Sequence, residues 1–186
     1  VLTVPSMPQH LFAKEEGTTI LIVTHDNRIL DVADRIVNMV DGRIISDVVV
    51  SESQAICEFL RRVPLFNGLL PDTLTKVADH MELVEYKPGE VVVRQGDPGD
   101  NFYLIRSGEA EVVFEDGGPG KVVATLDEGK FFGEMALETG EPRKATVRAK
   151  TDLTLCALDK EEYLAVKSAS ATFKEEISKV LFERQR

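Results

Sequence analysis

The stretch KPGEVVVRQGDPGDNFYLIRSGEAEVVFEDGGPGKVVATLDEG, residues 87–129, repeats one simple pattern. Short runs of apolar and β-branched residues with a period of two are separated by glycine-containing turns, at 88–89, 96–99, 107–108, 117–118 and 128–129. Such regular punctuation is typical of many short antiparallel strands. We therefore predict an α+β fold built on an antiparallel, jelly-roll-like β roll.

Helical periodicity brackets this predicted roll on both sides. Ahead of it, two runs place apolar residues three and four positions apart: Ile56, Phe59, Leu60 and Val63, and then Leu74, Val77, Ala78 and Met81. Behind it, Asp159 suits the N-cap of a helix, with Glu162 at the reciprocal position of a capping box. The final residues carry one more apolar stripe, made of Phe173, Ile177, Val180 and Leu181. We therefore expect helices before and after the roll.

The pattern changes near residue 51, and we expect a domain boundary there. Residues 51–186 hold the roll with its flanking helices, and residues 1–50 form a small α/β fragment ahead of it. In this first segment, TTILIVTH has the composition of a strand and DNRILDVAD has helical spacing. The Asp41-Gly42 pair predicts a tight turn between two short strands.

The triplet Thr24-His25-Asp26, which ends the first predicted strand, resembles the switch region of an ABC transporter ATPase. The resemblance implies that His25 is the residue that would reach the terminal phosphate of ATP. The sequence lacks the other parts of such an enzyme, namely a phosphate-binding loop, an apolar strand ending in Asp-Glu and a Leu-Ser-Gly-Gly signature. We interpret residues 1–50 as a truncated ABC-ATPase-like segment.

Composition excludes several classes of function. The 186 residues carry a net charge of −10 at a pI near 4.9, which disfavours binding to nucleic acids and to anionic membranes. Cys57 and Cys156 stand apart among apolar residues, as buried free thiols do in a reducing compartment. The three histidines show no metal-ligand spacing. With no signal peptide and no stretch of transmembrane length, a cytoplasmic protein without a bound metal is expected.

One segment interrupts the strand pattern, GEMALETGEP at residues 133–142. Its good helix formers predict a one-turn helix after Gly133, and the free N–H groups at a helix start attract anions. Arg143 would add a cation that can donate two parallel hydrogen bonds to a phosphate. Glu134, an acceptor beside a phosphate, needs a different partner, such as a sugar hydroxyl. The segment therefore predicts a ligand that carries both phosphate and ribose.

Gly133-Glu134-Met135-Ala136-Leu137, followed after four residues by Pro142-Arg143-Lys144-Ala145-Thr146, resembles the phosphate-binding cassette of the cyclic-nucleotide-binding domain. The resemblance implies that Arg143 pairs with the exocyclic phosphate oxygens and that Glu134 accepts from the ribose 2′-hydroxyl. It also implies a cradle of backbone N–H groups, and a relay from the cassette to the terminal helices at Leu137. The candidate ligand-binding residues are Gly133, Glu134, Met135, Ala136, Leu137, Arg143, Lys144 and Ala145.

Two positions bear on ligand choice. Cyclic-nucleotide-binding domains that prefer cAMP usually have alanine after the cassette arginine, and many that prefer cGMP have threonine. Lys144 lacks the threonine hydroxyl, so cAMP is favoured and cGMP stays open. Phe173 and Phe182 are candidates for a lid over the base, although their helical spacing is more typical of core packing.

We therefore expect a cyclic-nucleotide sensor that performs no catalysis, needs no cofactor and binds cAMP as ligand. Its regulated partner is expected to be an ABC-type transporter, because of the segment ahead of the roll. One alternative is the C-terminal part of an ABC transporter ATP-binding subunit, whose ligand-free roll serves as an interaction module. Another is an interaction module that forms a homodimer through the C-terminal helix. For Glu134 and Arg143 themselves, the alternative is a plain surface ion pair on a loop.

Overall fold

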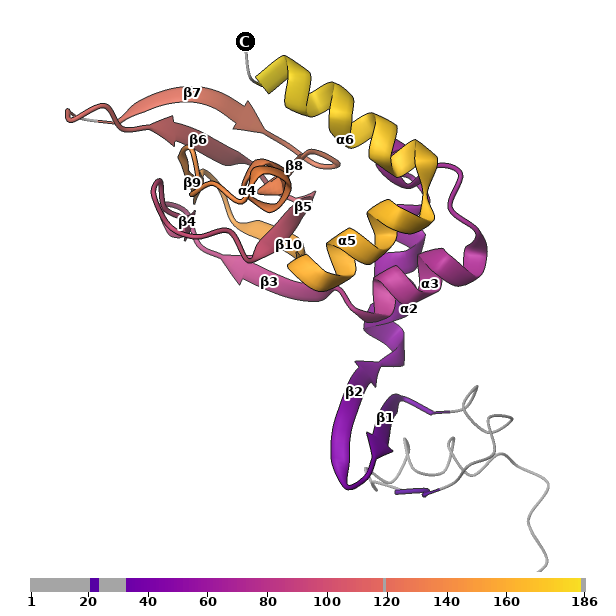
Figure 1. Ribbon diagram of the computed structural model, residues 1–186. Coiled ribbons are helices and arrows are strands. Elements are labelled where there is room, and N and C mark those ends of the chain that lie inside the picture. The colour runs from indigo at the N-terminus through magenta and orange to yellow at the C-terminus, as the bar shows by residue number, and fades with distance from the viewer. Residues whose placement is uncertain (1–20, 24–32, 119, 185–186) are drawn as a thin grey trace, which may run out of the picture. The chain divides into compact units, whose positions relative to one another are not determined.

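A computed structural model of the protein describes residues 21–23, 33–118 and 120–184 (Figure 1). The chain divides into two compact units, Val1–Glu52 and Ser53–Arg186. The triplet Thr24-His25-Asp26 and residues 26–32 of the helix predicted after it lie outside the described residues, and the last two residues of that predicted helix, Ala33 and Asp34, are not helical.

The first unit contains a β hairpin of strands β1 (Arg35–Val40) and β2 (Arg43–Val49), paired antiparallel. Asp41 and Gly42 connect them with φ angles of 49° and 76°. Two consecutive left-handed residues match the twist of the strands, so the hairpin predicted at Asp41-Gly42 is confirmed. The strand predicted ahead of Thr24 is wrong for its described residues 21–23, which are irregular and exposed. In this unit the described strands are β1 and β2, which pair with each other and offer residues 21–23 no ladder.

The second unit is a roll of two four-stranded antiparallel sheets, as predicted (Figure 1). One sheet has the order β3-β10-β5-β8 and the other the order β4-β9-β6-β7. The strands of the first are β3 (Glu82–Tyr86), β10 (Leu153–Asp159), β5 (Asn101–Ser107) and β8 (Phe131–Phe132). Those of the second are β4 (Val91–Val93), β9 (Thr146–Ala149), β6 (Ala110–Phe114) and β7 (Lys121–Leu126).

Apolar residues of both sheets form the core of the roll. Ile105, Leu153 and Leu155 are almost fully buried there, together with Val147 and Ala149 of the other sheet.

A turn glycine, Gly108, allows two segments of the roll to approach each other closely. A Cβ on Gly108, whose φ is +90°, would lie 2.1 Å from the carbonyl oxygen of Asp152. No other residue fits this turn without displacing the backbone beside it.

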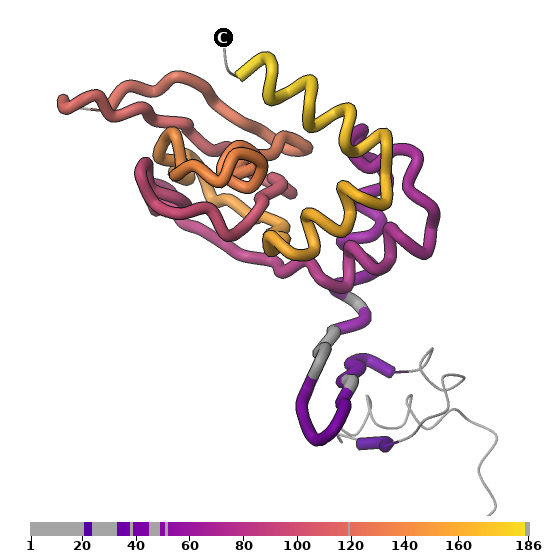
Figure 2. Tube along the Cα trace, in the orientation of Figure 1, coloured from indigo at the N-terminus to yellow at the C-terminus, as the bar shows by residue number. Residues whose placement is uncertain are grey.

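The helices gather at one end of the roll (Figure 1). They are α2 (Val50–Leu60), the 3-10 helix η2 (Pro64–Phe66), α3 (Pro71–Asp79), α5 (Lys160–Ala169) and α6 (Ala171–Arg184). The predicted N-cap of α5 is confirmed, because the Asp159 carboxylate accepts a hydrogen bond of 2.9 Å from the Glu162 backbone N–H. Extended backbone at Ser170 separates α5 from α6 and produces the bend seen in Figure 2.

Aromatic residues from strands and helices form a second core at this end. Phe102, Tyr163 and Phe173 are fully buried, and the ring centroids of Phe102 and Tyr163 lie 5.4 Å apart. Ile177 is also fully buried, while Val180 and Leu181 pack partly against the same cluster. The apolar stripe of α6 therefore covers this chain's own core, which leaves its buried half unavailable for a homodimer.

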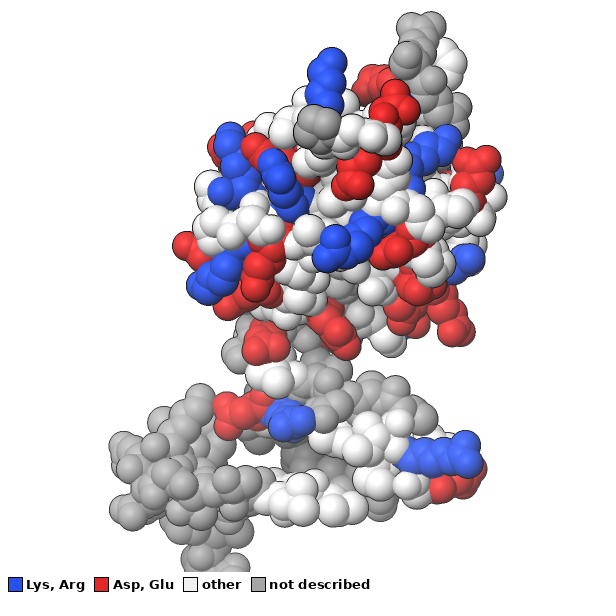
Figure 3. Space-filling model, turned by 90° about the vertical axis from the view of Figure 1, so that its left-hand side faces the viewer, with Lys and Arg blue, Asp and Glu red and all other residues white. Residues whose placement is uncertain are grey.

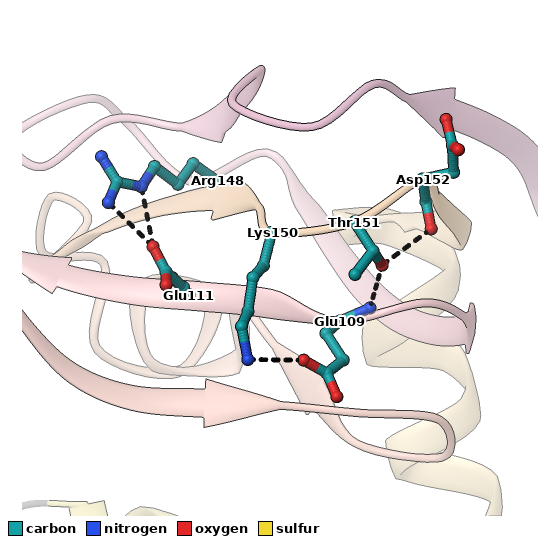
Figure 4. Close-up of polar contacts among 6 residues, drawn as sticks. All are labelled: Glu109, Glu111, Arg148, Lys150, Thr151 and Asp152. Atoms are coloured by element: carbon teal, nitrogen blue, oxygen red, sulfur yellow. Dashed lines mark hydrogen bonds and ion pairs between the residues drawn. The ribbon is translucent and has the colours of Figure 1, made fainter.

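The surface of the second unit carries charges of both signs. Acidic and basic side chains are interspersed on the face shown in Figure 3. Arg148 of β9 bonds to Glu111 of β6 at 2.8 Å, and Lys150 bonds to Glu109 at 2.7 Å just beyond the ends of these two strands (Figure 4). Such exposed pairs each stabilise a protein by about 1 kcal/mol or less.

Candidate ligand-binding site

The segment between β8 and β9 forms the predicted short helix, α4 (Glu134–Thr139). Gly133 precedes it with a φ of +94°, and Gly140 ends it with a φ of +72°. The Gly140 N–H donates back to the Ala136 carbonyl oxygen at 3.0 Å. Two left-handed glycines thus start and stop the helix, and no other residue type adopts this conformation without strain.

Arg143 is buried, with only 6% of its surface exposed, and its guanidinium is held in place. Nη1 donates to the Gly133 carbonyl oxygen and Nη2 to the Asn101 carbonyl oxygen, both at 2.8 Å. The guanidinium carbon lies 5.9 Å from the centre of the Tyr103 ring. Within the described chain, the buried Nε has no hydrogen-bond partner. Burial lowers the pKa of Arg143, yet a guanidinium stays charged in proteins.

The backbone of Arg143 is clamped by the turn that follows β4. Its N–H donates to the Asp97 carbonyl oxygen and its carbonyl oxygen accepts from the Gly96 N–H, both at 2.8 Å. Close by, the Thr146 hydroxyl accepts from the Gln95 N–H at 3.0 Å. Because main chain and side chain are both fixed, Arg143 needs little reorganisation to receive an anion.

A cavity of about 160 Å³ opens beside Arg143. Its walls combine apolar side chains with carboxylates and an amide: Val92, Val93, Asp97, Pro98, Asp100, Asn101, Tyr103 and Arg143. Pockets that enclose a whole small ligand measure roughly 300–1,000 Å³. The cavity therefore suits one polar end of a ligand, with the remainder lying at its mouth.

Glu134 is fully buried and faces a different partner from Arg143. Its Oε1 accepts a hydrogen bond of 2.7 Å from Nη1 of Arg184, at the end of α6. Its Oε2 has no partner among the described residues. Burial raises the pKa of Glu134, and the charge of Arg184 opposes that rise. Glu134 and Arg143 are thus fixed separately, so the alternative of a plain surface ion pair between them is wrong.

A third buried contact joins α4 to α5. Glu138 accepts a hydrogen bond of 2.8 Å from the hydroxyl of Tyr163, and its other oxygen bonds to the ammonium of Lys167. Tyr163 is fully buried, and burial together with Glu138 raises its pKa. The short helix is therefore tied to α5 by a carboxylate as well as by apolar packing.

Replacing Tyr163 with phenylalanine should lower the free energy of unfolding by about 2 kcal/mol, because a hydrogen bond to a charged group is lost without a change of shape. Denaturant unfolding measures this change. Ser178→Ala is the matched control: it removes an exposed hydroxyl that donates to the Lys174 carbonyl oxygen, and should change stability by less than about 0.5 kcal/mol. Equal stabilities for Y163F and S178A would contradict a structural role for the Glu138 contact.

The remaining candidate residues lie in different surroundings. Ala136 packs against the loop after β4, where a Cβ on Gly99 would lie 2.4 Å from the Ala136 Cβ and 3.4 Å from the Arg143 Cζ. Leu137 is buried in the aromatic core, as a relay to the helices requires. Met135 and Ala145 are half-buried. Lys144 is exposed, with its Nζ 3.4 Å from a carboxylate oxygen of Glu141.

Neither lid candidate covers the cavity. Phe173 is fully buried, with its ring centroid 5.6 Å from that of Phe66, and Phe182 is 61% exposed. Neither residue lines the cavity beside Arg143. Phe173 is therefore a core residue, as its spacing suggested.

The site also includes residues that the sequence interpretation passed over. Asp100, Asn101 and Tyr103 line the cavity, and Arg184 contacts Glu134. Asp100 and Asn101 follow a Gly-Asp-Pro-Gly turn directly, and this polar pair at the start of a buried strand, with Tyr103 two residues later, could have indicated them. Nothing near Arg184 in the sequence points to Glu134, fifty residues away.

The described residues contain neither a metal-binding cluster nor a helix suited to span a membrane. There, no three His, Cys, Asp or Glu side chains gather closely enough to hold a metal ion. No helix among these residues has the length and apolar character needed to cross a membrane.

Comparisons with known proteins show which domain family this part of the chain resembles. Residues 83–170 match the family model of the cyclic nucleotide-binding domain. A cAMP-dependent protein kinase regulatory subunit from Blastocladiella emersonii is 41% identical over 122 residues, which is 65% of this chain and 30% of that protein. The same subunit from Schizosaccharomyces pombe is 46% identical over 104 residues, 56% of this chain and 24% of that protein.

Solved structures agree with these matches. The regulatory domain of Toxoplasma gondii PKA, crystallised with cAMP, has a TM-score of 0.66 at 28% identity, covering 73% of this chain and 51% of that one. The Thermus thermophilus catabolite activator protein has a TM-score of 0.59 at 32% identity, covering 66% and 58%. The fold is thus that of cyclic-nucleotide-binding domains. The chain spans about 30% of the length of the Blastocladiella relative.

The interpretation of residues 1–50 as an ABC-ATPase-like segment gains no support from these matches. The matched part of the family model begins at residue 83, and the named relatives are kinase subunits and a catabolite activator protein. Its key residue, His25, lies outside the described residues.

Proposed function

We propose that the chain, whose residues 83–170 match the cyclic nucleotide-binding domain, is a non-catalytic regulatory module that binds cAMP. The single observation that carries the proposal is the environment of the Arg143 guanidinium. Its guanidinium is buried, immobilised by two backbone carbonyl groups and lines a small cavity with its Nε–H unpartnered. A buried cation with a spare donor is arranged to receive an anion.

In this proposal the phosphate of the cyclic nucleotide binds at Arg143. The N–H groups of Gly133 and of Ala136, in the first turn of α4, and of Lys144 complete its cradle. The ribose 2′-hydroxyl donates to the free Oε2 of Glu134, which is the other buried polar atom left without a partner in the described chain. The two unpartnered atoms thus match the phosphate and the ribose hydroxyl of a cyclic nucleotide.

The charges at the cavity favour a cyclic phosphate over a triphosphate. Asp97 and Asp100 line the same cavity as Arg143, so the cavity offers one guanidinium and two carboxylates. A phosphodiester with one negative charge can pair with Arg143 at moderate cost. The several charges of ATP would be repelled by both carboxylates.

We further propose that binding acts on the helices after the roll. The short helix α4 is linked to α5 through Glu138 and to α6 through Glu134. A ligand that holds α4 in one position therefore shifts the equilibrium of both helices toward the arrangement compatible with it. The shift is limited to the difference in ligand affinity between the two arrangements.

The preference for cAMP over cGMP and the identity of the regulated partner are argued from other residues and from the relatives. Lys144 has no hydroxyl to offer to a guanine, and its exposed side chain pairs with Glu141. The names of the relatives favour a protein kinase catalytic subunit as partner. The transporter partner remains a hypothesis from Thr24-His25-Asp26 alone.

Calorimetric titration of the full chain with cAMP, cGMP and ATP tests the proposal. We expect cAMP to bind with micromolar affinity or better, cGMP to bind more weakly and ATP not to bind. If neither cyclic nucleotide bound, the proposed function would be overturned and the interaction-module alternative would remain. Binding of ATP without cAMP would point instead to the ATPase-like segment.

Replacing Glu134 with glutamine should weaken cAMP binding by about fivefold to tenfold, because a neutral amide oxygen is a poorer acceptor than a carboxylate. The same change should leave the affinity for 2′-deoxy-cAMP within about twofold, since that ligand lacks the hydroxyl that Glu134 would accept from. Parallel titrations measure both. An equal loss for the two nucleotides would show that Glu134 does not contact the ribose.

A further inference from the structure

We propose that Tyr103 is a positioning residue for Arg143: its ring, stacked on Phe132, sets the place and the plane of the guanidinium that receives the phosphate. The role rests on the proposed function, because the position of Arg143 matters for binding only if Arg143 holds the ligand. It falls to an aromatic pair on β5 and β8, outside the short helix α4.

The aromatic pair stands where the ladder between β5 and β8 ends. The strand β8 has two residues, and Tyr103 lies opposite Phe132 in its antiparallel pairing with β5. The two rings are stacked, with centroids 5.0 Å apart and planes 18° from parallel. Both side chains are buried. A stacked cross-strand pair of this kind holds its two strands at a fixed distance.

The guanidinium of Arg143 bridges the same two strands just beyond this pair. Its Nη2 donates to the carbonyl oxygen of Asn101 in β5, and its Nη1 to that of Gly133, which directly follows β8. The two acceptors are thus two residues from Tyr103 and one residue from Phe132. If the strands moved apart, one of the two bonds would be lost. The spacing that the aromatic pair sets therefore determines where the guanidinium lies.

Tyr103 also contacts the guanidinium directly. The Cζ atom of Arg143 lies over the Tyr103 ring, 5.9 Å from its centre. The face of an aromatic ring carries negative potential and attracts a cation, most strongly where water is excluded. Arg143 is buried, and burial lowers its pKa, so a contact that favours the charged form is placed where the charge needs it.

These contacts determine the direction of the remaining donor. The buried Nε of Arg143 has no hydrogen-bond partner in the described chain, and Arg143 and Tyr103 both line the cavity of about 160 Å³. A guanidinium is rigid and planar, so fixing its plane and both Nη atoms also fixes the Nε–H bond. Tyr103 therefore helps to aim the spare donor that an anion would use.

A different role for Tyr103 would place its hydroxyl on the ligand. The Tyr103 Oη lies 3.5 Å from Nδ2 of Asn101, which is a long contact, and Tyr103 lines the cavity. A hydroxyl that donated to the phosphate would be needed for binding, whereas the ring alone suffices for positioning. Tyr103→Phe distinguishes the two roles, because it keeps the ring and removes the hydroxyl.

The test titrates the full chain with cAMP and compares Tyr103→Phe, Tyr103→Leu and Tyr86→Leu. Tyr86 is the matched control, because it is a half-buried tyrosine of β3 that packs against the same core and does not line the cavity. We expect Y103L to weaken cAMP binding about fivefold to tenfold, as loss of a desolvated cation–π contact does. Y103F and Y86L should each bind cAMP within about twofold of the wild type.

A double-mutant cycle with Arg143→Lys separates positioning from packing. Lysine keeps the charge but has no plane for the ring to orient and no fork to bridge two carbonyl groups. If Tyr103 acts through the guanidinium, Y103L should cost less than about twofold in the R143K background. If Tyr103 acts through core packing alone, Y103L should cost the same factor in both backgrounds.

Phe132→Leu is the second variant, for the case that Y103L does not fold. It removes the ring that supports Tyr103 and keeps an apolar side chain on β8. We expect F132L to weaken cAMP binding about threefold in the wild-type background, because an aromatic pair is lost, and to have no measurable effect in the R143K background. Denaturant unfolding shows which variants are folded at the temperature of the titration.

Each outcome decides between the hypotheses. An equal loss for Y103F and Y103L would overturn the proposal in favour of a hydroxyl contact to the ligand. An equal cost in both backgrounds, or an equal loss for Y86L, would overturn it in favour of packing. Wild-type protein that binds no cyclic nucleotide would overturn the proposed function, and the role of Tyr103 with it. Wild-type binding with an unaffected Y103L, or F132L in its place, would overturn the role of Tyr103 alone.

Discussion

Replacing Arg143 with alanine should weaken the binding of cAMP about a hundredfold. A hydrogen bond between charged groups stabilises by up to about 3 kcal/mol, so loss of the bond from the unpartnered Nε of Arg143 to the phosphate accounts for the roughly 2.8 kcal/mol that a hundredfold loss represents. Calorimetry with the purified variant measures the change. An unchanged affinity would contradict the assignment of Arg143 to the phosphate.

Arg143→Ala also disturbs the protein itself. It leaves the buried carbonyl oxygens of Gly133 and Asn101 without their guanidinium donors. Each such loss costs about 1–3 kcal/mol, so the variant should also unfold more easily. Arg143→Lys is the second variant, because it keeps the charge and loses the planar guanidinium with its Nε donor. It should bind cAMP about tenfold more weakly than the wild type, which separates recognition from unfolding.

Arg148→Ala is the control for both variants. Arg148 lies on β9, five residues after Arg143, and pairs with Glu111 on an exposed strand surface (Figure 4). Its removal deletes an arginine and an ion pair of little energetic weight. Affinity for cAMP should therefore stay within about twofold of the wild type. A loss comparable to that of R143A would indicate a general effect of net charge.

Local patterns in the sequence were sufficient to predict the roll and its helices. Turn chemistry at Asp41-Gly42 predicted the first hairpin, and the carboxylate at Asp159 predicted the start of α5. These features depend on residues within a few positions of one another, where propensity and capping decide the structure. The TTILIVTH strand failed at residues 21–23, because a strand needs a pairing partner that composition does not supply.

The site was predictable only in part, for the same reason. Glu134 and Arg143 are nine residues apart and could be identified from one segment. Their partners come from elsewhere: Asn101 from β5 and Arg184 from α6. Contacts across forty or fifty residues follow from how the sheets and helices pack. No local spacing encodes them.

Replacing Gly133 with alanine should reduce both the stability of the protein and its affinity for cAMP. The residue has a φ of +94°, where an L side chain costs about 1–2 kcal/mol. A Cβ there would also lie 2.6 Å from Nη1 of Arg143 and 2.7 Å from the Asn101 carbonyl oxygen. Either the guanidinium or the strand carbonyl must move, and both belong to the cavity wall. We expect at least about a tenfold loss of affinity, because a small misplacement at a preorganised site is costly.

Gly140→Ala separates the backbone strain from the collision with Arg143 and Asn101. Gly140 ends the same helix with a φ of +72°, and a Cβ there would meet nothing within 4 Å. It therefore carries the backbone penalty of about 1–2 kcal/mol without the collision. Denaturant unfolding should show G140A moderately destabilised and G133A more so, and titration should show near wild-type cAMP affinity for G140A alone. If both variants lost affinity equally, strain in α4 would explain the loss. If G133A kept its affinity, the guanidinium position set by the Gly133 carbonyl oxygen would not matter for binding.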